Sequence, residues 1–319
     1  MKERVSSKKK KDLIFYCLLL AYPLLQFTIF YIIVNANSIL LAFQEYESVL
    51  DGGSGGYHFL EFKNSLQNFA NVIQAFFGSE EVRDIKAVNV FANSFKAFGA
   101  QCFITLPLSI LFSYYIFKKG FMHNAFKLAL FMPQIVSNIV MCLMFRYMTS
   151  NVYSGLVNLF TGETVTGLLN NTETAFPTLI VFQVWVGFGT NVLLFSGAMS
   201  GINESVLEAG KIDGASPFKE FTNIVFPLTF PTLTVFVTLM LANLFTNQLS
   251  LFSFYGSENA ETEFWTMGYY LYHETIKARS GGGANYPYIS ALGLLITLFI
   301  APITFGIDTL LKKYGPSVD

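Results

Sequence analysis

Charged side chains are scarce in this chain, and their scarcity sets its class. Of the 319 residues only 13% are Asp, Glu, Lys or Arg, whereas soluble domains carry roughly 25%. Hydrophobic residues make up 53% of the chain, and its mean hydropathy is +0.48. These values exclude an ordinary soluble domain. Because the apolar runs are continuous rather than alternating, the sequence predicts an all-α integral membrane protein and no membrane-spanning strands.

Cysteine and histidine are equally rare, which limits the chemistry that we expect. The three cysteines, Cys17, Cys102 and Cys142, all lie in apolar stretches, so we interpret them as small core residues. Their spacing predicts neither a disulfide framework nor a metal site. The three histidines are scattered over different loops. Since no nucleophile, base or ligand set converges, we expect no catalytic residue and no bound metal.

A phosphate-binding loop is also absent from the sequence. The pattern Gly-x-x-x-x-Gly-Lys-[Ser/Thr] does not occur, because Gly210-Lys211 is followed by Ile212. We therefore expect this chain to bind no cofactor; if ATP drives its function, another subunit must hold the ATP and Mg²⁺. The net charge of −1 gives no indication of nucleic-acid binding.

Six apolar stretches are long enough to cross a bilayer, which takes about 20 residues in a helix. Lys and Arg concentrate between them on one side, so the positive-inside rule predicts that both termini are cytoplasmic. The stretches are residues 13–34, 90–117, 128–148, 176–199, 227–251 and 286–311.

Four of the regions outside these spans bear on the organisation of the chain. Residues 1–12 form a basic cytoplasmic tail, and residues 312–319 form a second one. Residues 35–89 form an extracytoplasmic region with a turn at 51–56 and an amphipathic helix, either a docking surface or a cover for the bundle. The helix is indicated by apolar residues at helical spacing: Leu66, Phe69, Val72, Ile73, Phe76 and Phe77.

The fourth polar region, residues 201–226, interrupts a core of five spans that covers residues 90–311. Asp213-Gly214 predicts a turn, since Gly tolerates a positive φ and Asp bonds its own backbone. Ser216 is a typical N-cap residue, and Pro217 suits the first helical position. The segment should therefore fold as a short helix, a turn and a second short helix that ends at Pro227.

This region also carries a recognisable motif. Glu208-Ala209, Asp213-Gly214-Ala215, then Phe221 and Ile224-x-x-Pro227, resembles the cytoplasmic coupling loop of permease subunits in binding-protein-dependent ABC importers of the carbohydrate-uptake, maltose and oligosaccharide type. The resemblance covers about twenty positions in fixed order. Gly210 stands where the family usually has Ala, and Gly costs about 1 kcal/mol against Ala inside a helix. We therefore expect a slightly softer coupling helix.

The resemblance implies a fold and a set of partners. The fold is the type I ABC importer permease fold in the inner or plasma membrane of a bacterium or archaeon. The partners are a second homologous permease, two ATP-binding subunits, an extracytoplasmic solute-binding lipoprotein or periplasmic protein, a carbohydrate and membrane lipid. Coupling to the ATPases would use the residues of the loop motif: Glu208, Ala209, Gly210, Asp213, Gly214, Ala215, Ser216 and Pro217.

Polar side chains within the spans are the candidates for the sugar path. Uncompensated polar groups at membrane depth are costly and usually face the bundle interior. Each candidate has interhelical hydrogen bonding as its alternative role. A spacing of four residues predicts that Asn243 and Asn247 share one helix face. The candidates are Gln134, Asn138, Gln183, Trp185, Asn191, Asn243 and Asn247.

Two other functions remain open at this point. An ion-coupled secondary transporter that works without ATPase subunits is the alternative, but such proteins usually place ionisable groups at mid-membrane and often show inverted repeats. Lys96, Arg146 and Asp308 lie near span ends instead, and no repeat is evident. An intramembrane enzyme is disfavoured by the missing catalytic set.

Overall fold

The computed structural model describes residues 2–47, 56–61, 64, 66–78, 85–256, 260–280 and 286–316. The chain divides into two compact units. One holds residues 1–77 and 277–295, and the other holds residues 78–276 and 296–319. The turn expected at residues 51–56 lies almost entirely outside the described residues.

The first unit contains a long N-terminal helix and a small hairpin. The helix runs through α1 (Lys2–Phe27), the π-helical η1 (Thr28–Ile33) and α2 (Val34–Leu41). Strands β1 (Gln44–Glu47) and β2 (Gly56–Phe59) pair antiparallel, with Gln44 opposite Phe59. The hairpin was not predicted, because its polar strands carry no strong alternating pattern.

The predicted amphipathic helix is present as α3 (Gln67–Phe77). Of the apolar residues that predicted this helix, Val72 and Phe76 are buried, whereas Ile73 and Phe77 are exposed. The Asn68 side-chain amide donates to the carbonyl oxygens of Ala42 and Gln44 at 2.9 and 2.8 Å, which ties the start of α3 to the end of α2.

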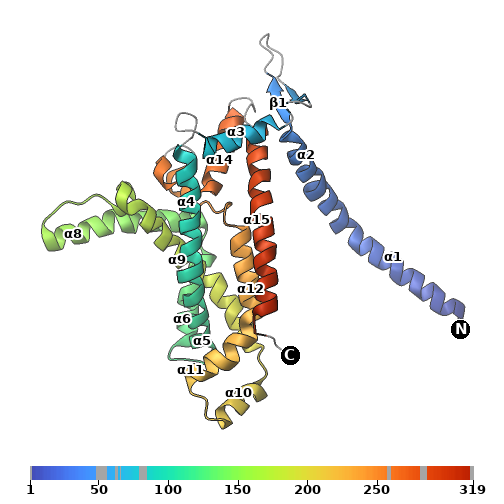
Figure 1. Ribbon diagram of the computed structural model, residues 1–319. Helices are drawn as coiled ribbons and strands as arrows, with labels where there is room; N and C mark the ends of the chain where they lie inside the picture. The colour runs from blue at the N-terminus through green and yellow to red at the C-terminus, as the bar shows by residue number, and fades with distance from the viewer. Residues whose placement is uncertain are drawn as a thin grey trace. The chain divides into compact units, whose positions relative to one another are not determined.

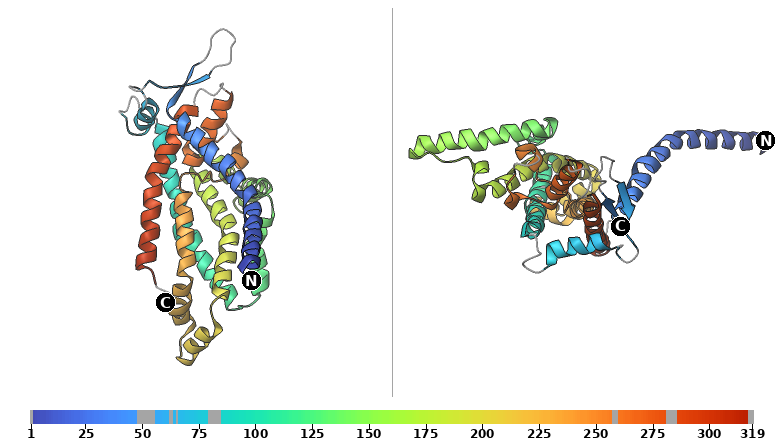
Figure 2. Two further views of the ribbon diagram at one scale, coloured as in Figure 1. Left: turned by 90° about the vertical axis from the view of Figure 1, so that its right-hand side faces the viewer. Right: turned by 90° about the horizontal axis from the view of Figure 1, so that it is seen from above.

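The second unit is a helical bundle in which α4, α5, α9 and α12 run side by side, as Figure 1 and the left view of Figure 2 show. Its elements are α4 (Ile85–Ala100), the π-helical η3 (Gln101–Thr105), α5 (Leu106–Phe117), α6 (His123–Ile135), α7 (Asn138–Tyr147), the π-helical η4 (Met148–Val152), α8 (Tyr153–Thr161), η5 (Leu168–Asn170), α9 (Thr172–Ser200), α10 (Glu204–Ile212), α11 (Pro217–Glu220), the π-helical η6 (Phe221–Val225), α12 (Phe226–Ala242), α13 (Leu251–Tyr255) and η7 (Thr262–Phe264). Two further helices, α14 (Met267–Ser280) and α15 (Tyr286–Tyr314), extend into both units.

Among the described residues, five helices are long and apolar enough to cross a membrane, or six if one bent pair counts as a span. The bent pair replaces the single helix predicted for residues 128–148. Val136 and Ser137 are extended, and the helices on either side meet at 106°. Hydropathy does not detect this break, because the apolar run continues through it.

The predicted fifth span, residues 227–251, is wrong at both ends. The helix starts at Pro217 and continues through η6 into α12, so Pro227 does not end it. Pro227 lies in the first turn of α12, directly after the π-helical segment, where its missing N–H is tolerated. At the other end α12 stops at Ala242, because Asn243 and Asn247 bond locally and compete with the helical pattern.

The core of this bundle lies where α5, α9 and α12 pack. Leu106, Ile110, Phe195, Met199 and Val225 form one buried cluster. Ser113 on α5 donates its hydroxyl to the Val192 carbonyl oxygen on α9 at 3.1 Å. Small polar residues of this kind let two helices approach closely. The elements α10 and α11 project from one end of this bundle (Figure 1).

Candidate functional site

The first helix, the turn and the start of the second helix in this segment lie where the sequence predicts them, although the second helix continues past Pro227. Asn203 caps α10 by accepting a hydrogen bond from the Ser205 amide at 3.1 Å. The turn follows at Asp213, and Gly214 has a φ of +74°, which glycine adopts without strain. Ser216 then caps α11, its hydroxyl accepting from the Lys219 amide at 3.4 Å.

The outer surface of this two-helix element combines the carboxylates of Glu208 and Asp213 with exposed apolar groups. Glu208, Ala209, Asp213, Gly214, Ser216 and Pro217 are exposed, and Ala215 is partly buried. Beside them Ile212 is 86% exposed and Phe218 is 75% exposed. Apolar side chains exposed to this degree on a short projecting element are typical of a protein-interaction surface.

The inner side of the element packs on the bundle. Gly210 is buried, and a Cβ at this position would lie 2.5 Å from the Ile224 side chain. Leu207 and Phe221 pack against the central cluster. The glycine that departs from the family pattern therefore leaves room for Ile224 rather than simply softening the helix.

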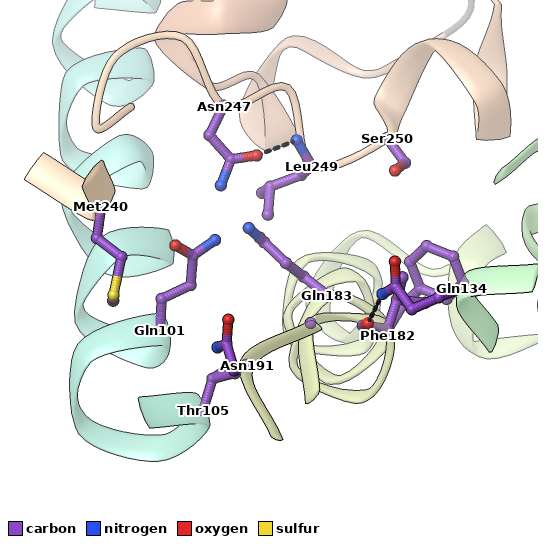
Figure 3. Close-up of a pocket in the computed structure, with 12 residues that line it drawn as sticks. Gln101, Thr105, Gln134, Phe182, Gln183, Asn191, Met240, Asn247, Leu249 and Ser250 are labelled. Carbon is purple, nitrogen blue, oxygen red and sulfur yellow. Dashed lines mark hydrogen bonds between the residues drawn. The ribbon is translucent and has the colours of Figure 1, made fainter. Parts of the chain in front are cut away.

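A second feature of this unit is a polar cavity of about 270 Å³ between the helices. Its walls come from η3, α6, α9, α12 and the loop that follows α12. Figure 3 shows the side-chain amides of Gln101, Gln183 and Asn247 directed toward one space. The lining residues are Gln101, Thr105, Gln134, Phe182, Gln183, Val186, Gly187, Asn191, Met240, Asn247, Leu249 and Ser250.

Two polar atoms at this cavity are buried and have no hydrogen-bond partner among the residues that the structure describes. They are Oε1 of Gln183 and Oγ1 of Thr105. Two other lining groups are paired: the Gln134 amide donates to the Val186 carbonyl oxygen, and Asn247 Oδ1 accepts from the Leu249 amide at 2.9 Å. Since buried polar atoms normally find a partner, the two unpaired oxygens are suited to bind water or a solute.

The cavity roof is a strained loop. Leu249 and Ser250 have φ values of +51° and +55°, which is uncommon for residues other than glycine. The Ser250 hydroxyl lies within 3.3 Å of the Asn138 amide, and Thr266 donates to the Asn247 carbonyl oxygen at 2.6 Å. These bonds hold the strained backbone, and strain of this kind is common at binding sites.

The structure brings some of the predicted path residues together and not others. Gln134, Gln183, Asn191 and Asn247 line the cavity. Asn138 and Trp185 do not line the cavity. The Asn138 amide donates to the hydroxyls of Ser250 and Ser253. The centroid of the Trp185 ring lies 6.1 Å from that of Phe145. Their roles stay predictions.

Asn243 also lies outside the cavity lining, although the Asn247 backbone amide donates to its carbonyl oxygen one turn away at 3.1 Å, and its role stays a prediction. The helix ends at Ala242, and the Asn243 amide donates to the Leu239 carbonyl oxygen at 2.9 Å. Sequence reasoning missed Gln101, Thr105 and Ser250. Gln101 and Thr105 were detectable as polar residues inside the second span, but Ser250 follows the unpredicted end of the helix.

No group of three His, Cys, Asp or Glu residues suited to a metal occurs in the part of the chain that the structure describes. The cavity lining likewise contains no charged residue among its described members. The site is therefore built from neutral hydrogen-bonding groups.

Comparisons with known proteins agree with this architecture. The chain is 28% identical over 170 residues to the probable starch degradation products transport system permease protein AmyD of Thermoanaerobacterium thermosulfurigenes, a match that covers 52% of this chain and 56% of that protein. It is 24% identical to the arabinooligosaccharides transport system permease protein AraP of Bacillus subtilis, covering 63% and 64%. These matches span less than two thirds of either relative.

A solved structure shows the same fold over nearly the whole chain. It belongs to a bacterial ABC transporter involved in the import of the acidic polysaccharide alginate, with a TM-score of 0.73, 17% identity and coverage of 98% and 99%. Residues 105–319 match the model of one family, and this range contains α10, α11 and most of the cavity. The chain therefore belongs to the family of binding-protein-dependent transport system inner membrane components.

Proposed function

We propose that this chain is one of two membrane subunits of an ATP-driven importer that carries a neutral oligosaccharide. Its relatives are named as permeases for starch degradation products and arabinooligosaccharides. A homologous permease completes the path, and an extracytoplasmic binding protein delivers the solute. Two ATP-binding subunits hold ATP and Mg²⁺, so this chain itself performs no catalysis.

The observation that carries the proposal is the neutral cavity with its two unpaired oxygens. Sugar hydroxyls donate hydrogen bonds, and Gln183 Oε1 and Thr105 Oγ1 are the acceptors of the cavity lining that are left unpaired and buried among the described residues. Val186 and Met240 add apolar surface to the same cavity, which suits the C–H faces of a sugar ring. A site of this composition suits an uncharged solute, since an ionised one would be buried without a counter-charge.

The exposed face of α10 and α11 is the contact for the ATP-binding subunits. We assign Glu208, Ala209, Asp213, Gly214, Ala215, Ser216 and Pro217 to this contact, with Gly210 packed behind it. The element is continuous with α9 and α12, so its rotation would turn both helices. In this arrangement the projecting end of the bundle, and both termini, are cytoplasmic.

The test is ATP hydrolysis by the complex copurified from its native membrane. In nanodiscs with the binding protein, neutral maltotriose or arabinotriose should stimulate hydrolysis, and an alginate trisaccharide should not. Gln183→Leu should raise the sugar concentration needed for half-stimulation about tenfold, because one sugar hydrogen bond is lost (about 1.4 kcal/mol).

Asn158→Leu is the matched control, since Asn158 is exposed on α8 and lies outside the cavity lining. This variant should leave the stimulation unchanged. Failure to copurify any ATP-binding subunit, or stimulation that depends on an ion gradient and not on a sugar, would refute the proposal.

A further inference from the structure

The carboxylate of Glu220 on α11 is buried, and it lies neither in the cavity lining nor on the exposed face of α10 and α11. Glu220 is 3% exposed, and its two oxygens accept hydrogen bonds from Lys118 Nζ at 2.9 and 3.0 Å. Lys118 directly follows α5 and keeps about a third of its side chain exposed (35%). A buried carboxylate is costly without a partner, so the pair holds α11 against the end of α5.

A second bond joins the same two elements. The Tyr114 hydroxyl donates to the Pro217 carbonyl oxygen at 2.8 Å, and its ring lies 4.9 Å from that of Phe221. Pro217 and Glu220 are the first and last residues of α11. Both ends of this short helix are therefore fastened to α5.

The end of α5 is connected to the cavity by an uninterrupted helix. Residues Val88–Phe117 form one 30-residue helical span, and Gln101 and Thr105 on it line the cavity. At a rise of about 1.5 Å per residue, Thr105 lies roughly 20 Å from Lys118 along this helix. A displacement of Lys118 is therefore transmitted to the cavity wall, because the helix between them moves as one rigid element.

We propose that Lys118 and Glu220 are positioning residues that transmit motion of the coupling element to α5, and through α5 to the cavity wall. The inference rests on the proposed function. Only α9 and α12 are joined to the element through the chain itself, so α5 follows them through the packed core and side-chain bonds. The ion pair fastens α5 directly to α11, so that the wall carrying Gln101 and Thr105 moves together with the element.

The experiment measures distances between spin labels in the complex with its ATP-binding subunits. With the native cysteines replaced by Ser, labels at Leu111 on α5 and Lys219 on α11 report the linkage. A label at Leu310 on α15 is the reference. All three positions are exposed. Distances are recorded without nucleotide and with ATP and vanadate.

In the wild type, the 111–219 distance should stay constant while the 111–310 distance shifts with nucleotide. In Glu220→Gln or Lys118→Gln, the 111–219 distance should change with nucleotide and the shift at 111–310 should be lost. Lys118→Arg should retain the wild-type behaviour, as should the charge-exchanged variant with Lys118→Glu and Glu220→Lys. Lys119→Gln is the matched control, since it removes an exposed neighbouring charge that forms no ion pair within the described residues.

The outcomes separate this inference from the proposed function. If no ATP-binding subunit copurifies, or if nucleotide moves no label in the wild type, the proposed function fails and the inference fails with it. If the wild type responds and Glu220→Gln responds identically, only the inference is overturned. Equal effects of Lys119→Gln and Lys118→Gln would also overturn it, since they would indicate a general charge effect.

Discussion

On the inner side of the coupling element, residues 204–220, the side chain of Ile224 fills the space that a side chain in place of Gly210 would need. A Cβ at position 210 would lie 2.5 Å from Cδ1 of Ile224, although the two residues belong to different helical segments, α10 and η6. The glycine is therefore matched to the size of its neighbour, and the pair fixes how closely the two segments approach.

This relationship predicts a coupled effect of two substitutions. Gly210→Ala should raise the free energy of unfolding by about 1 kcal/mol through helix propensity, but the close contact with Ile224 should lower it by a similar amount. In an Ile224→Val background, which removes Cδ1, the same substitution should be more favourable by about 1 kcal/mol. Thermal unfolding of the four proteins in nanodiscs measures this difference. Equal effects of Gly210→Ala in both backgrounds would contradict the packing argument.

Two glycines on α9 form a matched pair for testing its contact with α6. A Cβ at Gly189 would lie 2.9 Å from the Leu130 carbonyl oxygen, whereas one at Gly197 meets nothing within 4 Å. Gly189→Ala should therefore destabilise the protein by about 1–3 kcal/mol, and Gly197→Ala should be neutral or slightly stabilising. Thermal unfolding again provides the measurement, and similar shifts for the two variants would be inconsistent with the close approach of these helices.

Gly214 tests whether backbone conformation alone shapes the coupling turn. Its φ is +74°, and a Cβ at this position would meet no atom within 4 Å. Gly214→Val should thus cost about 1–2 kcal/mol through strain alone, whereas Gly214→Asn should cost clearly less because Asn tolerates this conformation. The check is ATP hydrolysis and thermal unfolding of both variants. If Gly214→Val and Gly214→Asn had equal hydrolysis rates and unfolding temperatures, residue 214 would not have a positive φ.

Asn243 and Asn247 should differ in their effects, because only Asn247 lines the cavity. Asn247→Leu removes a polar wall group and the bond that Asn247 Oδ1 accepts from the Leu249 amide. We expect about a tenfold loss of apparent sugar affinity from roughly 1.4 kcal/mol. Asn243→Leu removes local bonds to the Leu239 carbonyl oxygen and from the Thr246 hydroxyl, both outside the cavity, and should change the affinity less than twofold. The measurement is sugar-stimulated ATP hydrolysis. A larger loss of affinity in Asn243→Leu than in Asn247→Leu would contradict the assignment of Asn247 to the sugar site.

Much of the architecture could be predicted, because hydropathy and turn chemistry are local signals. The turn at Asp213-Gly214 and the cap at Ser216 follow from the preferences of those residues. The break at Val136-Ser137 could not be predicted, since its backbone is held by contacts distant in sequence, such as Asn138 with Ser253. The same limit applies to the cavity: amides within spans were recognisable, but their convergence depends on packing.

The ion pair of Lys118 with Glu220 illustrates this limit most clearly. The sequence places Glu220 near the start of a short helix, where a carboxylate suits the helix dipole. Its burial and its partner 102 positions away become visible only in the folded chain.

The central claim is that ATP hydrolysed by other subunits drives this chain through α10 and α11. The most direct measurement is uptake of a labelled neutral oligosaccharide into proteoliposomes, with the whole complex, with Glu208→Ala in the complex, and with this chain alone. We predict ATP-dependent uptake by the complex, its loss in Glu208→Ala with assembly intact, and none by the isolated chain. Uptake by the isolated chain on an ion gradient, or undiminished uptake by Glu208→Ala, would contradict the account.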